Sequence, residues 1–180
     1  MKLLLGFLLA LFSDLSHSSG QTDEWFAAAR NDEVMKIEAL LQQAPSLLNL
    51  RDGKGYTALV LSSYHNHRAL TLKLKSFGAD PCLPDLRGNT ALMGVIFKGH
   101  RELIIDLIGS CAVDHRNNEG QTALMYASLF GREDTVKLLI ERGAHVDLTD
   151  HEGRTALTLA EGQWNKAMVS LLKTFNVIEK

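Results

Sequence analysis

The residues that first suggest chemistry are two adjacent serines, Ser62 and Ser63, which stand close to His65. A hydroxyl beside an imidazole is the pair that a hydrolase uses to activate a nucleophile. All three residues lie within about one helical turn, with neither a Gly-x-Ser-x-Gly turn to expose a nucleophile nor an acid to orient the histidine. No other stretch pairs a nucleophile with a base, so we predict that the chain is not an enzyme.

Seven histidines raise the question of a metal site, above all the pair in His65-Asn66-His67. The other histidines are scattered, without the Cys/His spacing of a zinc site, and two histidines at a helix end are usually solvated. The glycines recur with a fixed period that turns explain, and none forms a phosphate-binding loop after a strand. The sequence therefore predicts no metal and no cofactor.

The first twenty residues differ in kind from the rest. Lys2 precedes an apolar stretch, residues 3–12, which a Ser/Gly-rich segment follows. A cationic start, ten apolar residues and small residues at the end are typical of a secretory signal peptide, and the apolar stretch is shorter than the roughly 20 residues of a spanning helix. A buried or amphipathic helix fits less well, because the stretch is apolar on every face. We expect residues 1–20 to be cleaved, after Ser18 or Gly20, and the product to be periplasmic or secreted, without a membrane span.

The charge of the chain limits its partners. Its 180 residues include 19 basic and 21 acidic side chains, for a net charge of −2, and 46% are hydrophobic. Without residues 1–20 the balance is 18 to 20, so the net charge stays −2. A phosphate backbone attracts proteins with a broad positive field, which this composition does not supply. We expect no nucleic-acid partner.

Four copies of a short motif, Gly-x-Thr-Ala-Leu, follow residues 1–20 in the sequence. Their threonines are 33, 32 and 33 residues apart, at Thr57, Thr90, Thr122 and Thr155. We expect each hydroxyl to cap a helix by accepting a backbone N–H, and the glycine two residues earlier to take a positive φ in a tight turn. Each motif begins a unit of two predicted helices. One pair of helices cannot bury all of its own aliphatic side chains, which in the unit of the third motif include Val136, Leu138, Leu139 and Ile140. The units must therefore stack.

The pattern resembles the ankyrin repeat, whose units begin Asp-x-x-Gly-x-Thr-Pro-Leu-His and end near Gly-Ala-Asp. The leading position holds Asp52, Asp85, Asn117 and Asp150, and the helix exit matches at Gly78-Ala79-Asp80 and Gly143-Ala144-His145. Alanine replaces proline in all four motifs, and the histidine position holds Val60, Met93, Met125 and Thr158, so we expect lower stability per unit. The resemblance runs from about Thr22 to the end. It implies an all-α solenoid of about five helix-turn-helix units with β-hairpin-like turns.

A degenerate unit precedes the four motifs. Ile37, Leu40 and Leu41 match the aliphatic positions of the 118–150 unit at a constant offset of 99, which places Asp23 where Thr122 caps. We expect one domain over residues 21–180, with an N-terminal capping repeat and a C-terminal one because the ends of a solenoid need polar caps. The expected units are about 22–52, 53–85, 86–117, 118–150 and 151–180.

The resemblance implies that first helices and turn tips line a concave face. Two sets of residues then form rows along this face: those seven and eight positions after each capping residue, and those at the tips of the turns. The rows combine aromatic and aliphatic side chains with charged groups, as interface hot spots do. We expect the partner surface to consist of Tyr56, Tyr64, His65, Arg87, Asn89, Phe97, Lys98, Gln121, Leu129 and Phe130. Because Phe97 and Phe130 are one position apart in their units, we also expect at least one to point into the core.

Two cysteines, Cys82 and Cys111, fall in neighbouring units at different positions. An even pair permits a disulfide in an oxidising compartment. The bond requires Cα atoms within about 7 Å, so a disulfide and two buried, inert thiols both stay open.

These observations predict a non-catalytic module, monomeric by itself, that binds one folded protein through its concave face. The resemblance implies roles known among small exported bacterial ankyrin proteins, namely support of catalase and peroxide resistance, or immunity against a secreted antibacterial effector. The alternative is a secreted effector or small hydrolase on an ankyrin scaffold. A structural adaptor in a larger complex is a third reading.

Overall fold

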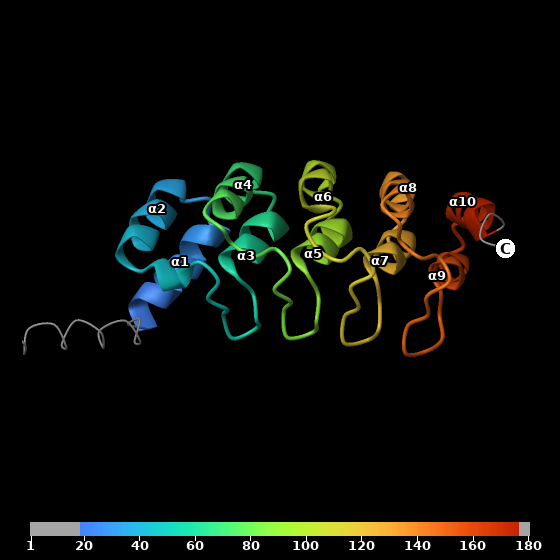
Figure 1. Cartoon of the computed structure of the whole chain (residues 1–180), viewed down its shortest axis with the longest axis horizontal. Coiled ribbons are helices and arrows are strands. Elements are labelled where there is room, and N and C mark those ends of the chain that lie inside the picture. Colours follow the sequence, from blue (N-terminus) through green and yellow to red (C-terminus); the bar gives the residue numbers. More distant parts are fainter. Residues whose placement is uncertain (1–18, 177–180) are drawn as a thin grey trace, which may run out of the picture.

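The computed structural model describes residues 19–176, so all but the last two residues of the expected signal peptide lie outside the described residues. Within that range ten α-helices form five antiparallel pairs that follow one another along one axis (Figure 1). The first helices of the pairs are α1 (Ser19–Arg30), α3 (Ala58–Tyr64), α5 (Ala91–Lys98), α7 (Ala123–Leu129) and α9 (Ala156–Gly162). The second helices are α2 (Val34–Gln43), α4 (Arg68–Ser76), α6 (Arg101–Leu107), α8 (Glu133–Glu141) and α10 (Lys166–Asn176).

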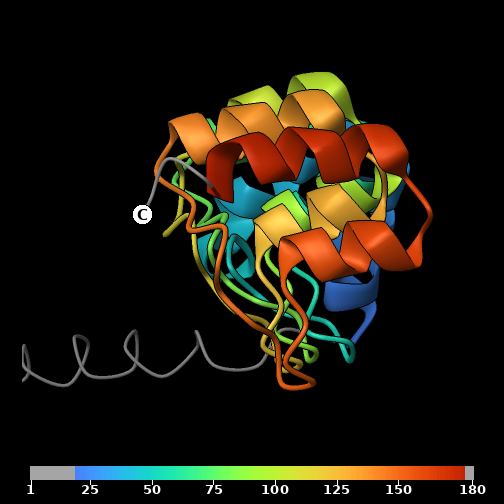
Figure 2. The same cartoon turned by 90° about the vertical axis from the view of Figure 1, so that its right-hand side faces the viewer.

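The helices form two layers, with first helices in one and second helices in the other (Figures 1 and 2). A 3-10 turn, η1 (Pro45–Leu47), follows α2. Long loops connect each unit to the next and project together on the side of the first helices (Figures 1 and 2). This arrangement confirms the predicted fold class, an all-α ankyrin-repeat solenoid. In the described part of the chain no helix has the length and apolar character needed to cross a bilayer.

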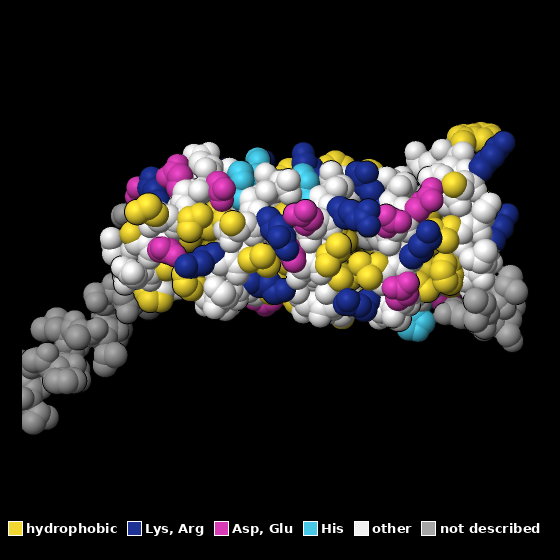
Figure 3. Space-filling model, turned by 90° about the horizontal axis from the view of Figure 1, so that it is seen from above, with side chains coloured by type: hydrophobic (Ala, Val, Ile, Leu, Met, Phe, Trp, Pro, Cys, Tyr) yellow, Lys and Arg dark blue, Asp and Glu magenta, His cyan; other side chains and the backbone are white. Residues whose placement is uncertain are grey.

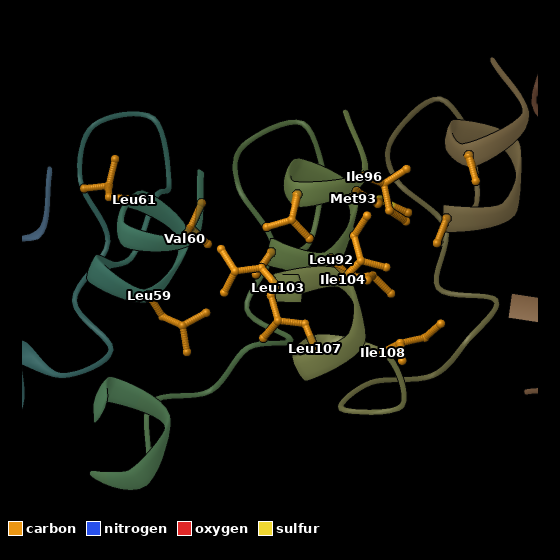
Figure 4. Packing of buried hydrophobic residues seen from close by; sticks show 14 of the residues in the cluster. Leu59, Val60, Leu61, Leu92, Met93, Ile96, Leu103, Ile104, Leu107 and Ile108 are labelled. Atoms are coloured by element: carbon orange, nitrogen blue, oxygen red, sulfur yellow. The ribbon is translucent and has the colours of Figure 1, made fainter. Parts of the chain in front are cut away.

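Stacking buries the apolar face of every unit. Leu59, Leu92, Leu103 and Leu107 lie between the layers and between units (Figure 4), and each is at most 8% exposed. Burying such a side chain stabilises the fold by about 1.5–3 kcal/mol. Each first helix packs against its own second helix and against the first helix of a neighbouring unit, so a unit removed from the stack would expose the part buried between units.

Threonine caps begin three of the first helices. The hydroxyls of Thr57, Thr122 and Thr155 accept the N–H group three residues on, at 3.2, 3.3 and 3.2 Å. The expectation is wrong at Thr90, which has the same extended backbone but makes no capping bond. It is also wrong at Asp23, because α1 already includes Ser19 and so contains Asp23 in its interior.

The loops share a hydrogen-bond network. In each, the leading Asp or Asn accepts the backbone N–H groups two and four residues on, at 2.8–3.0 Å. Single backbone bonds then join successive loops: Lys54 O accepts from Leu86 N, Arg87 O from Asn118 N, and Glu119 O from His151 N. The loops are therefore held at a constant spacing.

A disulfide joins Cys82 and Cys111, whose Cα atoms are 5.5 Å apart. Cys82 follows α4 and Cys111 follows α6, so the bond links the segments after two successive second helices. Because the cysteines are 29 positions apart in the sequence, the chain-entropy model assigns the cross-link about 3.5 kcal/mol of stabilisation.

Ion pairs connect the second helices across unit boundaries. Lys73 pairs with Glu38 at 2.6 Å, Arg68 with Asp106 at 2.6 Å and Arg101 with Asp134 at 3.0 Å. The outer face of this layer accordingly shows both signs of charge interspersed (Figure 3). Exposed pairs of this kind contribute about 0–1 kcal/mol each, so they support the stacking without driving it.

The loop glycines give a direct test of the links between units. Gly88 and Gly153 occupy the same loop position with φ of 81° and 76°, but a Cβ on Gly88 would lie 2.7 Å from Asn118 N, whereas a Cβ on Gly153 meets nothing within 4 Å. We expect Gly153→Ala to lower the free energy of unfolding by about 1 kcal/mol, the backbone cost alone. Gly88→Ala should cost roughly twice as much or more, because the loop contact must also shift. Urea unfolding followed by circular dichroism measures both, and equal losses would contradict the proposed role of the contact.

Candidate functional site

Two adjoining hollows run along the first-helix layer where it meets the loops. One, of about 670 Å³, lies between α1 and α3, and the other, of about 420 Å³, lies between α3, α5 and α7. Tyr56, Val60 and Tyr64 line both hollows. The two therefore form one continuous depression, which we call the concave groove.

The structure brings the ten residues of the predicted partner surface together. Nine line the concave groove: Tyr56, Tyr64, His65, Arg87, Asn89, Phe97, Gln121, Leu129 and Phe130. The tenth, Lys98, lies at its edge with Nζ 5.0 Å from the centre of the Tyr64 ring, a cation–π contact. That these residues bind a partner stays a prediction.

Aromatic rings form a strip along the groove. Tyr64 and Phe97 are stacked with centroids 6.4 Å apart, and Phe130 meets the Phe97 ring edge-on at 4.9 Å. The expectation that Phe97 or Phe130 points into the core is wrong, since Phe97 is 43% exposed and Phe130 is half-buried against it. Phe97 belongs to the last turn of α5 and Phe130 follows α7, so both side chains project beyond the packed part of their helices.

Sequence reasoning missed Tyr126, which is half-buried beside the strip. Its hydroxyl donates to Asn89 Oδ1 at 2.9 Å and receives Asn117 Nδ2 at 3.4 Å, so it ties α7 to two loops. Burial raises the pKa of Tyr126, and the positive charge of Arg87 partly offsets the rise. The available signal was the position itself: Tyr126 stands four residues after its capping threonine, where α5 has the small Gly94.

The floor of the groove is apolar. Val60 and Met93, at positions where the family pattern has histidine, are 7% and 1% exposed and line it. At the edge, burial lowers the pKa of His65, and the neighbouring His67 and Lys98 lower it further. His65 therefore adds an uncharged imidazole to the groove near neutral pH.

The serines that first suggested chemistry do not face the groove. Ser62 and Ser63 are 0% and 1% exposed; Ser62 Oγ donates to Leu59 O, and Ser63 Oγ donates to Val60 O. Neither is placed to attack a substrate. Across residues 19–176 no three His, Cys, Asp or Glu side chains gather as a metal site would require.

Comparison with known proteins matches residues 69–150 to the family model described as ankyrin repeats (3 copies). Among relatives, the potassium channel AKT2/3 of Arabidopsis thaliana is 30% identical over 147 residues, which cover 82% of this chain and 17% of the channel. A homologue of transient receptor potential cation channel subfamily A member 1 from Caenorhabditis elegans is 29% identical over 133 residues, covering 74% and 11%. ZDHHC13 of Danio rerio, named as a candidate palmitoyltransferase, is 33% identical over 129 residues, covering 69% and 20%. The chain thus spans about a fifth or less of each relative.

The Tyr126 network gives a prediction for stability and its pH dependence. Tyr126→Phe leaves Asn89 and Asn117 without this partner, so we expect a loss of about 1–2 kcal/mol at neutral pH. Because the folded-state pKa of Tyr126 is raised, its contribution is full below the ordinary value of about 10 and is lost as pH rises through the folded pKa. The gap between wild type and variant in urea unfolding should therefore narrow at alkaline pH.

Tyr64→Phe is the matched control, because the Tyr64 hydroxyl has no hydrogen bond in the described structure and the side chain is 37% exposed. We expect it to change stability by less than about 0.5 kcal/mol. Equal effects of the two substitutions would contradict the assigned role of Tyr126.

Proposed function

Given that the chain is an ankyrin-repeat solenoid, we propose that it is a non-catalytic module that binds one partner protein through the concave groove. The observation that carries this proposal is the aromatic strip of Tyr64, Phe97 and Phe130, continuous across three units and open to solvent. Exposed apolar patches on soluble proteins commonly mark interaction sites. Ankyrin repeats are interaction scaffolds, so fold and surface point to the same activity.

We further propose that the chain works in an oxidising compartment, the periplasm or the cell exterior. Two independent features support this: the signal-peptide pattern of residues 1–20, and the disulfide between Cys82 and Cys111, a bond that reducing cytosol disfavours. The relatives named above are from a plant, a nematode and a fish. A bacterial source therefore rests on the resemblance.

For the biological role, we propose support of catalase and peroxide resistance, or neutralisation of a secreted antibacterial effector. In both roles a non-catalytic surface must recognise one protein, which the concave groove suits. Identification of the captured partner decides between them, because one role requires a catalase and the other a toxic effector.

The groove is tested by partner capture from periplasmic extract followed by mass spectrometry. Tyr64→Ala and Phe97→Ala each remove an anchor of the strip, and we expect each to weaken capture about 30-fold, the effect of losing roughly 2 kcal/mol at a hot spot. Ile105→Ala is the control, since Ile105 is a 55% exposed apolar residue of the second-helix layer. With helical circular dichroism intact in all three, unchanged yield from the groove variants would overturn the proposed surface.

Export is tested by the redox state of the two cysteines in bacterial cells. With thiols blocked at lysis, the full chain should be found outside the cytoplasm with both cysteines unreactive, because they are bonded. A chain lacking residues 1–20 should stay in the cytoplasm with both cysteines alkylated. A full chain recovered from the cytoplasm with free thiols would contradict the proposed location.

A further inference from the structure

Two carboxylates of the concave groove, those of Asp52 and Asp85, are bound by other groups of the chain. One oxygen of Asp52 accepts two backbone N–H groups of its own loop, and the other pairs with Arg30 at 3.2 Å. Asp85 is 9% exposed; it accepts two loop N–H groups on one oxygen and the side-chain amide of Asn89 on the other. Arg30 offsets the charge of Asp52, whereas Asp85 keeps its charge but is nearly inaccessible to an incoming anion.

The cations around the groove are available by contrast. Among residues 19–176, neither Lys54 nor Lys98 has a carboxylate within ion-pairing distance. Arg87 reaches only Glu119, at 3.5 Å, and its side chain is 72% exposed. Two lining carboxylates form no ion pair in the described structure: Asp23, at the N-terminal end, and Asp85, which is 9% exposed.

These cations flank the aromatic strip on both sides. Lys98 sits over the Tyr64 ring beside the helix ends, whereas Lys54 and Arg87 come from the loops. On the second-helix layer, Lys73, Arg68 and Arg101 are all paired with acids of a neighbouring unit. The groove thus presents accessible cations on a chain of net charge −2, whereas Asp52 is paired with Arg30 and Asp85 is nearly buried. Local complementarity of this kind selects a partner and its register.

The dimensions favour a narrow occupant. The hollow between α3, α5 and α7 holds about 420 Å³, in the range of sites that receive a few side chains. A loop or terminal segment can enter it, whereas a flat protein surface would leave it empty.

We propose that the segment bound in the concave groove is acidic: an extended stretch of the partner protein that places an apolar or aromatic side chain against Tyr64, Phe97 and Phe130 and carboxylates beside Lys98, Lys54 and Arg87. This inference rests on the proposed function and specifies the chemistry of the partner at that same groove.

The probe is a phage-displayed library of random dodecapeptides, selected on the purified full chain with its disulfide intact. We expect the selected peptides to carry aromatic or aliphatic residues flanked by Asp and Glu. A synthetic peptide of the selected consensus should bind about tenfold or more weakly to Lys98→Glu and to Arg87→Glu, and more weakly as salt rises. Lys98→Gln, which removes the charge without reversing it, should lie between wild type and Lys98→Glu.

Lys137→Glu is the matched control, because Lys137 is exposed on α8 of the other layer and its reversal changes net charge by the same amount. All variants should keep the wild-type unfolding midpoint. If Lys137→Glu weakens peptide binding as much as Lys98→Glu does, or if the selected peptides are not enriched in Asp and Glu, the proposal of an acidic segment is overturned.

Phe97→Ala separates this inference from the proposed function. If the selected peptides bind Phe97→Ala more weakly but bind Lys98→Glu as tightly as the wild type, the groove is still the binding surface but its preference for acids is overturned. If neither substitution changes the affinity of the selected peptides, both proposals are overturned. A wild-type dimer in sedimentation equilibrium that Phe97→Ala dissociates would assign the groove to a second copy of the chain and overturn the acidic segment.

Discussion

The structure depends on one constraint: a pair of short helices has more apolar surface than it can bury by itself. The first helices, at 7–12 residues, are too short to be stable alone in water, so their stability comes from packing. Stacking answers this, because each pair covers the face of its neighbour. The loop-to-loop bonds, the cross-unit ion pairs and the disulfide all act on an arrangement that apolar burial has already fixed.

The same constraint creates the concave groove. Stacking buries the sides of the first helices but not the residues at their C-terminal ends. Side chains such as Phe97 and Phe130 therefore project beyond the packed part of the helices. Since the units repeat, these side chains align in a row, and the loops, held at constant spacing, supply the polar border. A surface built in this way can change its side chains without disturbing the core beneath it.

Much of the fold followed from spacing in the sequence. The threonine period predicted the units, and the offset of 99 is reproduced at the second helices, where α2 begins at Val34 and α8 at Glu133. Asp32 and Gly131, also 99 positions apart, both have a positive φ between the helices. The spacing failed at the N-terminal end, where α1 extends past the predicted capping position of Asp23.

The sequence by itself determined the repeat, the two-helix unit and the rows of residues that face one side, because each of these depends on local spacing that every unit repeats. Only the tertiary structure decided the rest. The 5.5 Å approach of Cys82 and Cys111, the exposure of Phe97 and the bond from Tyr126 to Asn89 arise between units. Such contacts depend on how one unit is rotated and displaced against the next, and a one-dimensional pattern carries the period of the stack but not that geometry.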